Sequence, residues 1–102
     1  DYFVKEETDR KARIEWIIPN AQKHQMEPIR LTLEPGGSSY PDNPHEGEEF
    51  GYVIEGEITI HLGKKLIPVG AGESFYFVPS KRHSISTDTG AQLIWVSTPP
   101  SF

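Results

Sequence analysis

The chain has 102 residues, no cysteine and a formal net charge of −5. This length suits one domain, and the lack of cysteine excludes disulfides and thiolate metal sites and fits a reducing cytoplasm. The acidic balance argues against direct binding to nucleic acid, which needs clustered Lys and Arg. Since no apolar run approaches the ~20 residues of a membrane-spanning helix, we expect no membrane partner.

Short apolar and β-branched runs follow one another along the chain, separated by Gly, Pro, Asn and Asp. Residues 6–13 show no apolar stripe and are predicted to be a polar lead-in. The strands predicted after it are residues 13–18, 26–33, 49–55, 57–62, 65–69, 74–78, 83–87 and 91–97. Gly56 separates two of them and indicates a tight hairpin turn. So many short strands without a helix favour an antiparallel barrel or sandwich.

The chain ends in a segment that cannot continue the last strand. Pro99 and Pro100 lack the backbone N–H that a strand interior requires. Phe102 follows them, and we expect it to dock on the domain as an apolar plug.

A cluster of metal-ligand residue types lies at the start of the third predicted strand. His45 and Glu49 are four residues apart, and Asn43 shares their parity. Even separations place side chains on one face of an extended chain. His83 opens a later strand, and Tyr40 precedes the cluster and can cover a pocket. Two imidazoles and a carboxylate suit one divalent transition metal, such as Zn, Ni, Mn or Fe.

A metal-free pocket is the alternative interpretation. There His45 and Glu49 would bond to each other or to an organic ligand. Glu46 and Glu48 flank His45 and can form an acidic mouth with Glu49. An acidic mouth would favour a cationic effector such as an amine, although solubility alone also explains these charges.

The spacing of this segment resembles the first motif of the cupin family, which runs Gly, five residues, His, one, His, three or four, Glu, six, Gly. Gly37, Asn43, His45, Glu49 and Gly56 occupy its positions, with Asn43 at the first His. Gly72, Pro79 and His83 resemble the second motif. The resemblance implies an all-β fold, a single cupin β-barrel (double-stranded β-helix or jelly roll) over residues 1–102.

The same resemblance implies a site. Its tentative metal ligands are His45, Glu49, His83 and Asn43. Its effector pocket would be lined by Tyr40, Asn43, His45, Glu49 and His83. No catalytic residue is expected.

Residues 45–57, 71–77 and 95–102 resemble one branch of the cupins, the C-terminal sensory domains of bacterial helix-turn-helix regulators. The chain shows no helix-turn-helix pattern and begins at Asp1 without Met, so we expect a C-terminal fragment of a longer regulator. The resemblance implies a small-molecule effector, a homodimer, and DNA binding only through an upstream domain. The alternative is a small metal-dependent enzyme, an oxygenase or isomerase. Asn43 in place of the first His favours a receptor over a catalyst.

Overall fold

Buried and exposed residues alternate along most of the chain, which is the pattern of strands with one face turned to a core. The computed structural model describes residues 3–18 and 23–102. Its elements are β1 (Phe3–Glu7), η1 (Thr8–Arg10, a 3₁₀ turn), β2 (Ala12–Trp16), β3 (Glu27–Leu33), β4 (Glu48–Leu62), β5 (Lys65–Gly70), β6 (Ser74–Phe77), β7 (His83–Ser86) and β8 (Ala91–Thr98). No helix in these residues is long and apolar enough to cross a membrane.

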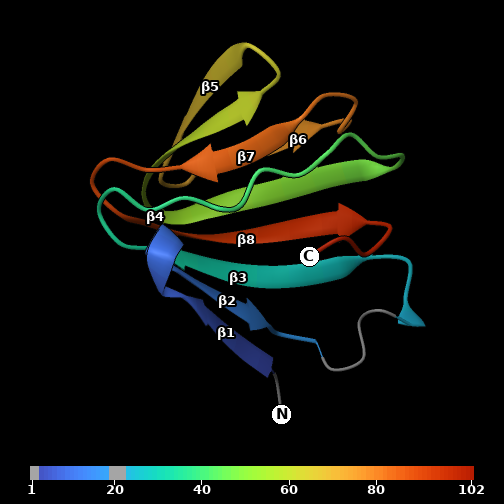
Figure 1. The fold of residues 1–102 in the computed structure, drawn as a ribbon, viewed down its shortest axis with the longest axis horizontal. Coiled ribbons are helices and arrows are strands. Elements are labelled where there is room, and N and C mark those ends of the chain that lie inside the picture. The colour runs from blue at the N-terminus through green and yellow to red at the C-terminus, as the bar shows by residue number, and fades with distance from the viewer. Residues whose placement is uncertain (1–2, 19–22) are drawn as a thin grey trace.

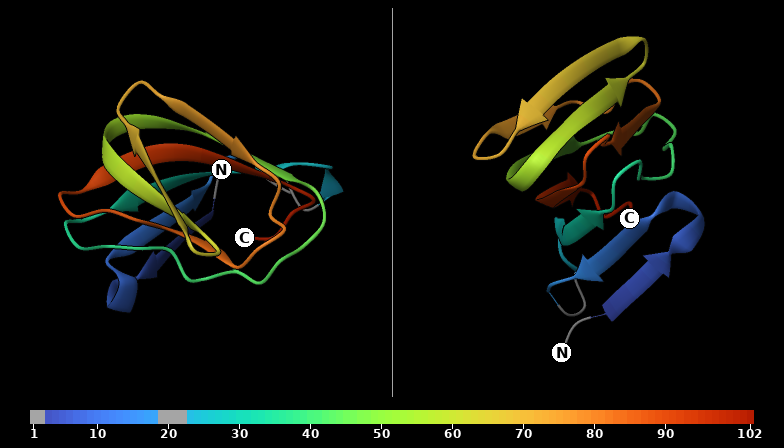
Figure 2. Two further views of the ribbon diagram at one scale, coloured as in Figure 1. Left: turned by 90° about the horizontal axis from the view of Figure 1, so that it is seen from above. Right: turned by 90° about the vertical axis from the view of Figure 1, so that its left-hand side faces the viewer.

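All strand pairs are antiparallel, and they form two layers that share β4 (Figure 1). The first layer runs β1-β2-β3-β8-β4-β6, using the first half of β4. The second half of β4 lies between β5 and β7. Seen from above, the strands surround an interior in which the C-terminus lies (Figure 2). The predicted all-β jelly roll is therefore confirmed.

The predicted hairpin turn at Gly56 is wrong. β4 runs through this residue as one strand of 15 residues, and Gly56 marks the place where the strand passes from one layer to the other. Its φ of +79° bends the chain, and a Cβ there would lie 2.1 Å from the carbonyl oxygen of Gly90. Glycine is needed here because the backbone at Gly90 approaches closely. The sequence alone did not distinguish this need from that of a tight turn.

The predicted polar lead-in over residues 6–13 is also wrong. Its first part belongs to β1, which pairs along its whole length with β2, from Phe3 opposite Trp16 to Glu7 opposite Ala12. Lys11 reverses the chain between them with a φ of +55°. Backbone pairing with β2 holds this strand. Its side chains show little of the apolar–polar alternation by which a strand is predicted from sequence.

The core lies between the two layers and is closed by the C-terminus. Its fully buried apolar residues include Ile29, Leu31, Ile60, Ile85 and Leu93. The predicted plug is confirmed, because the ring of Phe102 meets that of Trp95 edge to face at 4.8 Å. The buried carboxylate of Glu27 accepts hydrogen bonds from the backbone N–H groups of Ser101 and Phe102, both at 2.8 Å. This end of the chain is thus part of the packed interior.

Candidate functional site

Three elements of the jelly roll bring the candidate ligands together. Glu49 is the second residue of β4 and faces inward, His83 is the first residue of β7, and His45 lies in the loop before β4. The backbone of Asp42 exchanges two hydrogen bonds with that of His83, which draws the loop against β7. The chain therefore places at one point residues that are 34 positions apart.

Glu49 is the centre of the site and is 1% exposed. Its Oε2 lies 2.9 Å from Nε2 of His45 and 3.0 Å from Nε2 of His83. Its Oε1 accepts a hydrogen bond from the indole N–H of Trp95 at 2.8 Å. His83 is as deeply buried as Glu49, and its ring packs edge-on against Phe77 at 5.5 Å. One oxygen of this buried carboxylate thus accepts a hydrogen bond from Trp95, and the other lies within 3.0 Å of the Nε2 atoms of two imidazoles.

The backbone fixes which nitrogen of each imidazole carries hydrogen. Nδ1 of His83 lies 2.9 Å from the carbonyl oxygen of Lys81, and Nδ1 of His45 lies 2.8 Å from that of Glu46. A carbonyl oxygen only accepts, so each Nδ1 donates. In a neutral imidazole Nε2 then holds a lone pair. Both lone pairs point at a carboxylate oxygen, an arrangement of acceptors that requires protons or a cation between them.

A divalent metal ion fits this arrangement, because the two Nε2 lone pairs and the carboxylate oxygen can all bind to it. His45, Glu49 and His83 each offer one ligand atom, and these atoms all lie within 4.8 Å of one another. Each imidazole is oriented through its Nδ1–H, as the imidazoles of metal sites commonly are. The donor set of two nitrogens and one oxygen suits Zn, Ni, Mn or Fe.

Asn43, the fourth residue of the predicted ligand set, lies apart from the other three. It is exposed, and its Oδ1 accepts a hydrogen bond at 3.2 Å from Nη1 of Arg82. The neighbouring residue Asp42 takes the place beside the cluster, with Oδ2 3.8 Å from Nε2 of His83. Residues 43–47 lie outside the strands and the chain bends at Glu46 and Gly47, so the parity of an extended chain does not hold from Asn43 to Glu49. Nothing in the sequence pattern signalled Asp42.

Burial and charge shift the protonation of this cluster. Burial by itself would lower the pKa of His83, but the hydrogen bonds to Glu49 and to the Lys81 carbonyl, with the charges of Glu49 and Asp42, raise it overall. Burial and the charge of Glu49 raise the pKa of Asp42, against the opposing charges of His83 and His45. Without a metal, His83 and Asp42 therefore hold their protons more firmly than free side chains do, because the pKa of each is raised.

A cavity of about 110 Å³ adjoins the cluster. Asp42 and Trp95, which contact the ligand residues, also line it. The remaining lining residues are Glu7, Ile14, Ile29, Leu31, Ser39, Tyr40, Ser101 and Phe102. The cavity thus includes Tyr40 from the predicted effector pocket, and two carboxylates that the sequence interpretation did not place there.

The residues of the predicted acidic mouth do not gather at one opening. Glu49 points into the core, whereas Glu48 is exposed and accepts a hydrogen bond from the hydroxyl of Tyr76 on the outer side of the sheet. The acidic groups that line the cavity are Glu7 and Asp42 instead. Glu7 lies at the end of β1, the strand that sequence reasoning missed.

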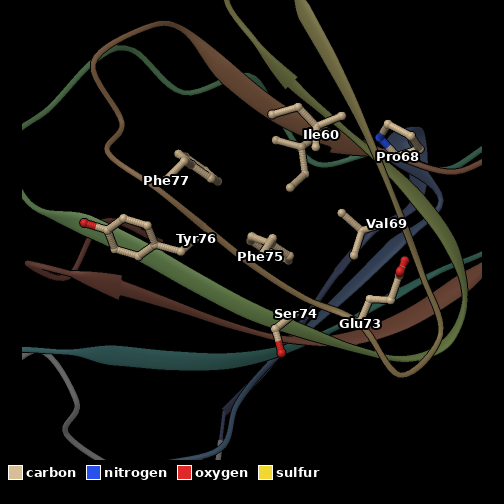
Figure 3. A pocket seen from close by; sticks show the side chains of 9 residues that line it. Ile60, Pro68, Val69, Glu73, Ser74, Phe75, Tyr76 and Phe77 are labelled. Carbon is tan, nitrogen blue, oxygen red and sulfur yellow. The ribbon is translucent and has the colours of Figure 1, made fainter.

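A second hollow, of about 340 Å³, lies between β5 and β6 (Figure 3). Phe75 and Phe77 face Ile60 and Val69 across it, and Glu73 is its only carboxylate. Oε1 of Glu73 already accepts a hydrogen bond from the backbone N–H of Gly70 at 2.6 Å. This hollow is apolar and holds none of the candidate ligands.

Comparison with known proteins places the chain in a family. A model of the cupin domain matches residues 29–99. The HTH-type transcriptional regulator PuuR, in both Escherichia coli K12 and Shigella flexneri, is 32% identical over 73 residues. That match covers 70% of this chain and 40% of each relative, so the chain spans less than half the length of the curated relatives it matches.

Solved structures share the fold at lower identity. An HTH_3 family transcriptional regulator from Vibrio cholerae superimposes with a TM-score of 0.81 at 20% identity, covering 96% of this chain and 56% of its own. The cupin domain of an XRE family regulator from Enterobacter cloacae gives 0.75 at 18%, covering 89% and 99%. The polyketide cyclase RemF from Streptomyces resistomycificus gives 0.71 at 22%, covering 89% and 69%. The chain belongs to the cupin family and is related to transcriptional regulators.

Proposed function

We propose that this chain is the effector-binding domain of a transcriptional regulator. The observation that carries the proposal is the small cavity beside the His45–Glu49–His83 cluster. At about 110 Å³ it is below the 300–1,000 Å³ typical of drug-sized ligand sites, and thus suits a ligand of few atoms. The relationship to helix-turn-helix regulators supports the same function.

The cluster is proposed to hold one divalent metal ion. Nε2 of His45, Nε2 of His83 and Oε2 of Glu49 would be its ligands. When bound, the ion supplies positive charge and Lewis acidity at the cavity wall. The protein contributes two imidazoles held by backbone carbonyls and a carboxylate held by Trp95.

The effector is proposed to be a small amine. Glu7 is 8% exposed, and its carboxylate has Lys5 Nζ as a salt-bridge partner at 3.5 Å. Asp42 lies on the same cavity, together with the rings of Tyr40 and Trp95. Carboxylates and aromatic faces together are the chemistry that recognises an ammonium group.

The domain is further proposed to act as a homodimer within a longer protein that lies in the cytoplasm and reads DNA through another domain. Helix-turn-helix proteins bind two-fold operators as dimers. An effector that binds one dimer arrangement more tightly than another shifts the population toward it. DNA affinity then changes through the spacing of the DNA-binding domains.

A metal-dependent enzyme is the second candidate function. Three metal ligands that leave coordination positions open are the arrangement of many non-haem iron sites, and the fold is shared with the cyclase named above. The two candidates differ in what becomes of the ligand, because a receptor releases it unchanged.

Calorimetry on zinc-loaded protein tests the receptor proposal. Short aliphatic amines are expected to bind more tightly than carboxylates of equal length, and NMR of the recovered amine should show no product. Glu7→Gln should weaken amine binding. Glu6→Gln is the matched control, because Glu6 is exposed and its carboxylate pairs with Arg13 at 3.3 Å. Tighter binding of carboxylates would refute the amine, and turnover of the amine would favour the enzyme.

A further inference from the structure

The cavity beside the candidate ligand residues meets solvent at two of the residues that line it. Tyr40 is 41% exposed and Ser101 is exposed as well, whereas the other lining residues are buried or half-buried. Ser101 is fixed by its backbone, because its N–H donates a hydrogen bond to the buried carboxylate of Glu27 at 2.8 Å. Tyr40 lies in the segment that joins β3 to β4, outside any strand. Tyr40 is therefore the lining residue whose movement can open the cavity.

Two residues of the η1 turn hold the side chain of Tyr40. Its hydroxyl donates a hydrogen bond to Oδ2 of Asp9. The guanidinium of Arg10 lies over its ring, with Cζ 4.5 Å from the ring centroid, a distance at which a cation and an aromatic ring attract each other. Nη1 of Arg10 also donates a hydrogen bond to Oγ of Ser38 at 3.5 Å. The turn thus holds both the hydroxyl and one face of the ring.

The backbone on both sides of Tyr40 is anchored independently of these contacts. The N–H of Ser39 donates to the carbonyl of Ile85 at 2.8 Å, and its Oγ accepts from the N–H of Ile85 at 2.9 Å. Asp42 exchanges two backbone hydrogen bonds with the first residue of β7. Tyr40 and Pro41 lie between these anchors. Rotation of the Tyr40 side chain about its own χ bonds can therefore uncover the cavity while the backbone stays in place.

We propose that Tyr40 is a gate on this cavity, which Asp9 and Arg10 hold shut, and that its opening sets the rates at which a small ligand enters and leaves. Asp9 is exposed and Arg10 is half-buried, so water can replace both contacts and the gate can open without unfolding. The β1–β2 hairpin that carries these two residues also carries Glu7 on the cavity wall. The ligand part of this inference rests on the proposed function, and the gate itself does not.

The reaction rate of a buried thiol measures how often the gate opens. The chain has no cysteine, so Leu31→Cys introduces a single thiol on the cavity, at a residue that is 1% exposed. Methyl methanethiosulfonate is a probe of few atoms that suits the cavity. Tyr40→Phe, added to Leu31→Cys, removes the hydroxyl that bonds to Asp9 and retains the ring. It should raise the labelling rate about tenfold, the scale of a lost hydrogen bond to a charged group.

Two matched controls accompany this measurement. Tyr76→Phe also removes a hydroxyl that donates to an exposed carboxylate, that of Glu48 at 2.7 Å, but Tyr76 lies outside this cavity. It should leave the labelling rate within about twofold. Ile60→Cys places a thiol that is equally buried on the hollow of Figure 3, and Tyr40→Phe should not speed its labelling. Equal acceleration of both thiols, or an unchanged rate at Leu31→Cys, would overturn the gate.

A second thiol position covers the case in which Leu31→Cys does not fold. Ile29 lines the same cavity and is also 1% exposed. Tyr40→Phe should speed the labelling of Ile29→Cys by the same factor as that of Leu31→Cys. An unchanged rate at Ile29→Cys would likewise overturn the gate.

Stopped-flow binding of propylamine to zinc-loaded protein separates the gate from the proposed function. Tyr40→Phe should raise the association and dissociation rates of the amine alike, by about tenfold, and should leave Kd within about threefold, because a gate changes access more than the bound state. Unchanged amine rates would overturn the control of ligand exchange by Tyr40. If no protein binds propylamine, the amine proposal fails, and accelerated labelling of Leu31→Cys still supports the gate.

Discussion

Two buried carboxylates of this protein are nearly identical in their surroundings and differ in one respect. Glu27 is 0% exposed and Glu49 is 1% exposed, and each accepts a hydrogen bond from a tryptophan indole. Trp16 donates to Glu27 at 2.7 Å, and Trp95 donates to Glu49 at 2.8 Å. The difference lies in the other partners of each carboxylate.

Glu27 receives its remaining hydrogen bonds from backbone N–H groups of the C-terminal segment, whereas Glu49 faces two imidazoles. A backbone N–H can only donate, so the Glu27 cluster has one state and acts as a clamp. Imidazole Nε2 can hold a proton, a lone pair or a metal ion. The two carboxylates therefore differ in whether their partners can exchange a proton or a metal ion, and not in the carboxylate itself.

The largest expected effect is on metal affinity. His83→Ala removes one of three ligands from the Glu49 cluster and should reduce zinc affinity by about a thousandfold, because the two remaining side chains do not complete a site. Glu27→Gln should leave zinc affinity unchanged. Competition with a chromogenic chelator measures both. Equal zinc affinity in His83→Ala and wild type would show that the cluster is not the metal site.

The two carboxylates should also differ in how much their replacement by glutamine lowers the free energy of unfolding. Glu27→Gln turns one oxygen into an NH₂ group that faces N–H donors, and should cost about 3 kcal/mol of unfolding free energy through unsatisfied buried groups. In metal-free Glu49→Gln, the amide oxygen can still accept from Trp95 while its two hydrogens meet the two Nε2 lone pairs. This variant should remain within about 1 kcal/mol of wild type.

Urea unfolding of both glutamine variants in the presence of a chelator makes this measurement. A large loss of stability in Glu49→Gln would mean that its imidazoles carry protons on Nε2, so that the two clusters are alike. A small loss in Glu27→Gln would mean that the C-terminal segment does not depend on the clamp.

A smaller effect is expected from the residues beside the cluster. Asp42→Asn removes a charge 3.8 Å from Nε2 of His83 and should weaken zinc binding by about tenfold, the scale of outer-shell effects. Asn43→Ala should change it by less than twofold, because Asn43 pairs with Arg82 outside the site. The reverse order of effects would restore the ligand role that the sequence assigned to Asn43.

The sequence predicted the fold and the meeting of His45, Glu49 and His83, three of the four predicted ligands, because strand alternation and motif spacing carry both. Alternation, turn residues and the spacing of His45 and Glu49 are readable along the chain. The structure added Asp42, Glu7 and the clamp at Glu27, and each of these depends on pairing between distant segments. Glu27 shows the limit most clearly, since its partners lie 74 and 75 positions away and are backbone groups with no side-chain signature.

The smallest expected effect is on the pH dependence of stability, which should differ between variants of the two clusters. His83 has a raised pKa in the metal-free folded protein, so its protonation stabilises the fold. That contribution is complete below the ordinary pKa of 6.5 and is lost as the pH rises through the raised value. Metal-free wild type should therefore lose stability over this range.

Glu49→Gln should show a flatter profile, because an uncharged amide no longer favours the imidazolium. Glu27→Gln should keep the wild-type slope, since its partners do not titrate. Chelator-treated samples unfolded in urea between pH 6 and 9 give the three slopes. A wild-type slope in Glu49→Gln would mean that Asp42, and not Glu49, is the group that holds the proton on His83, because Asp42 is the other charge facing this ring. The pair of carboxylates would then differ through a residue outside both clusters.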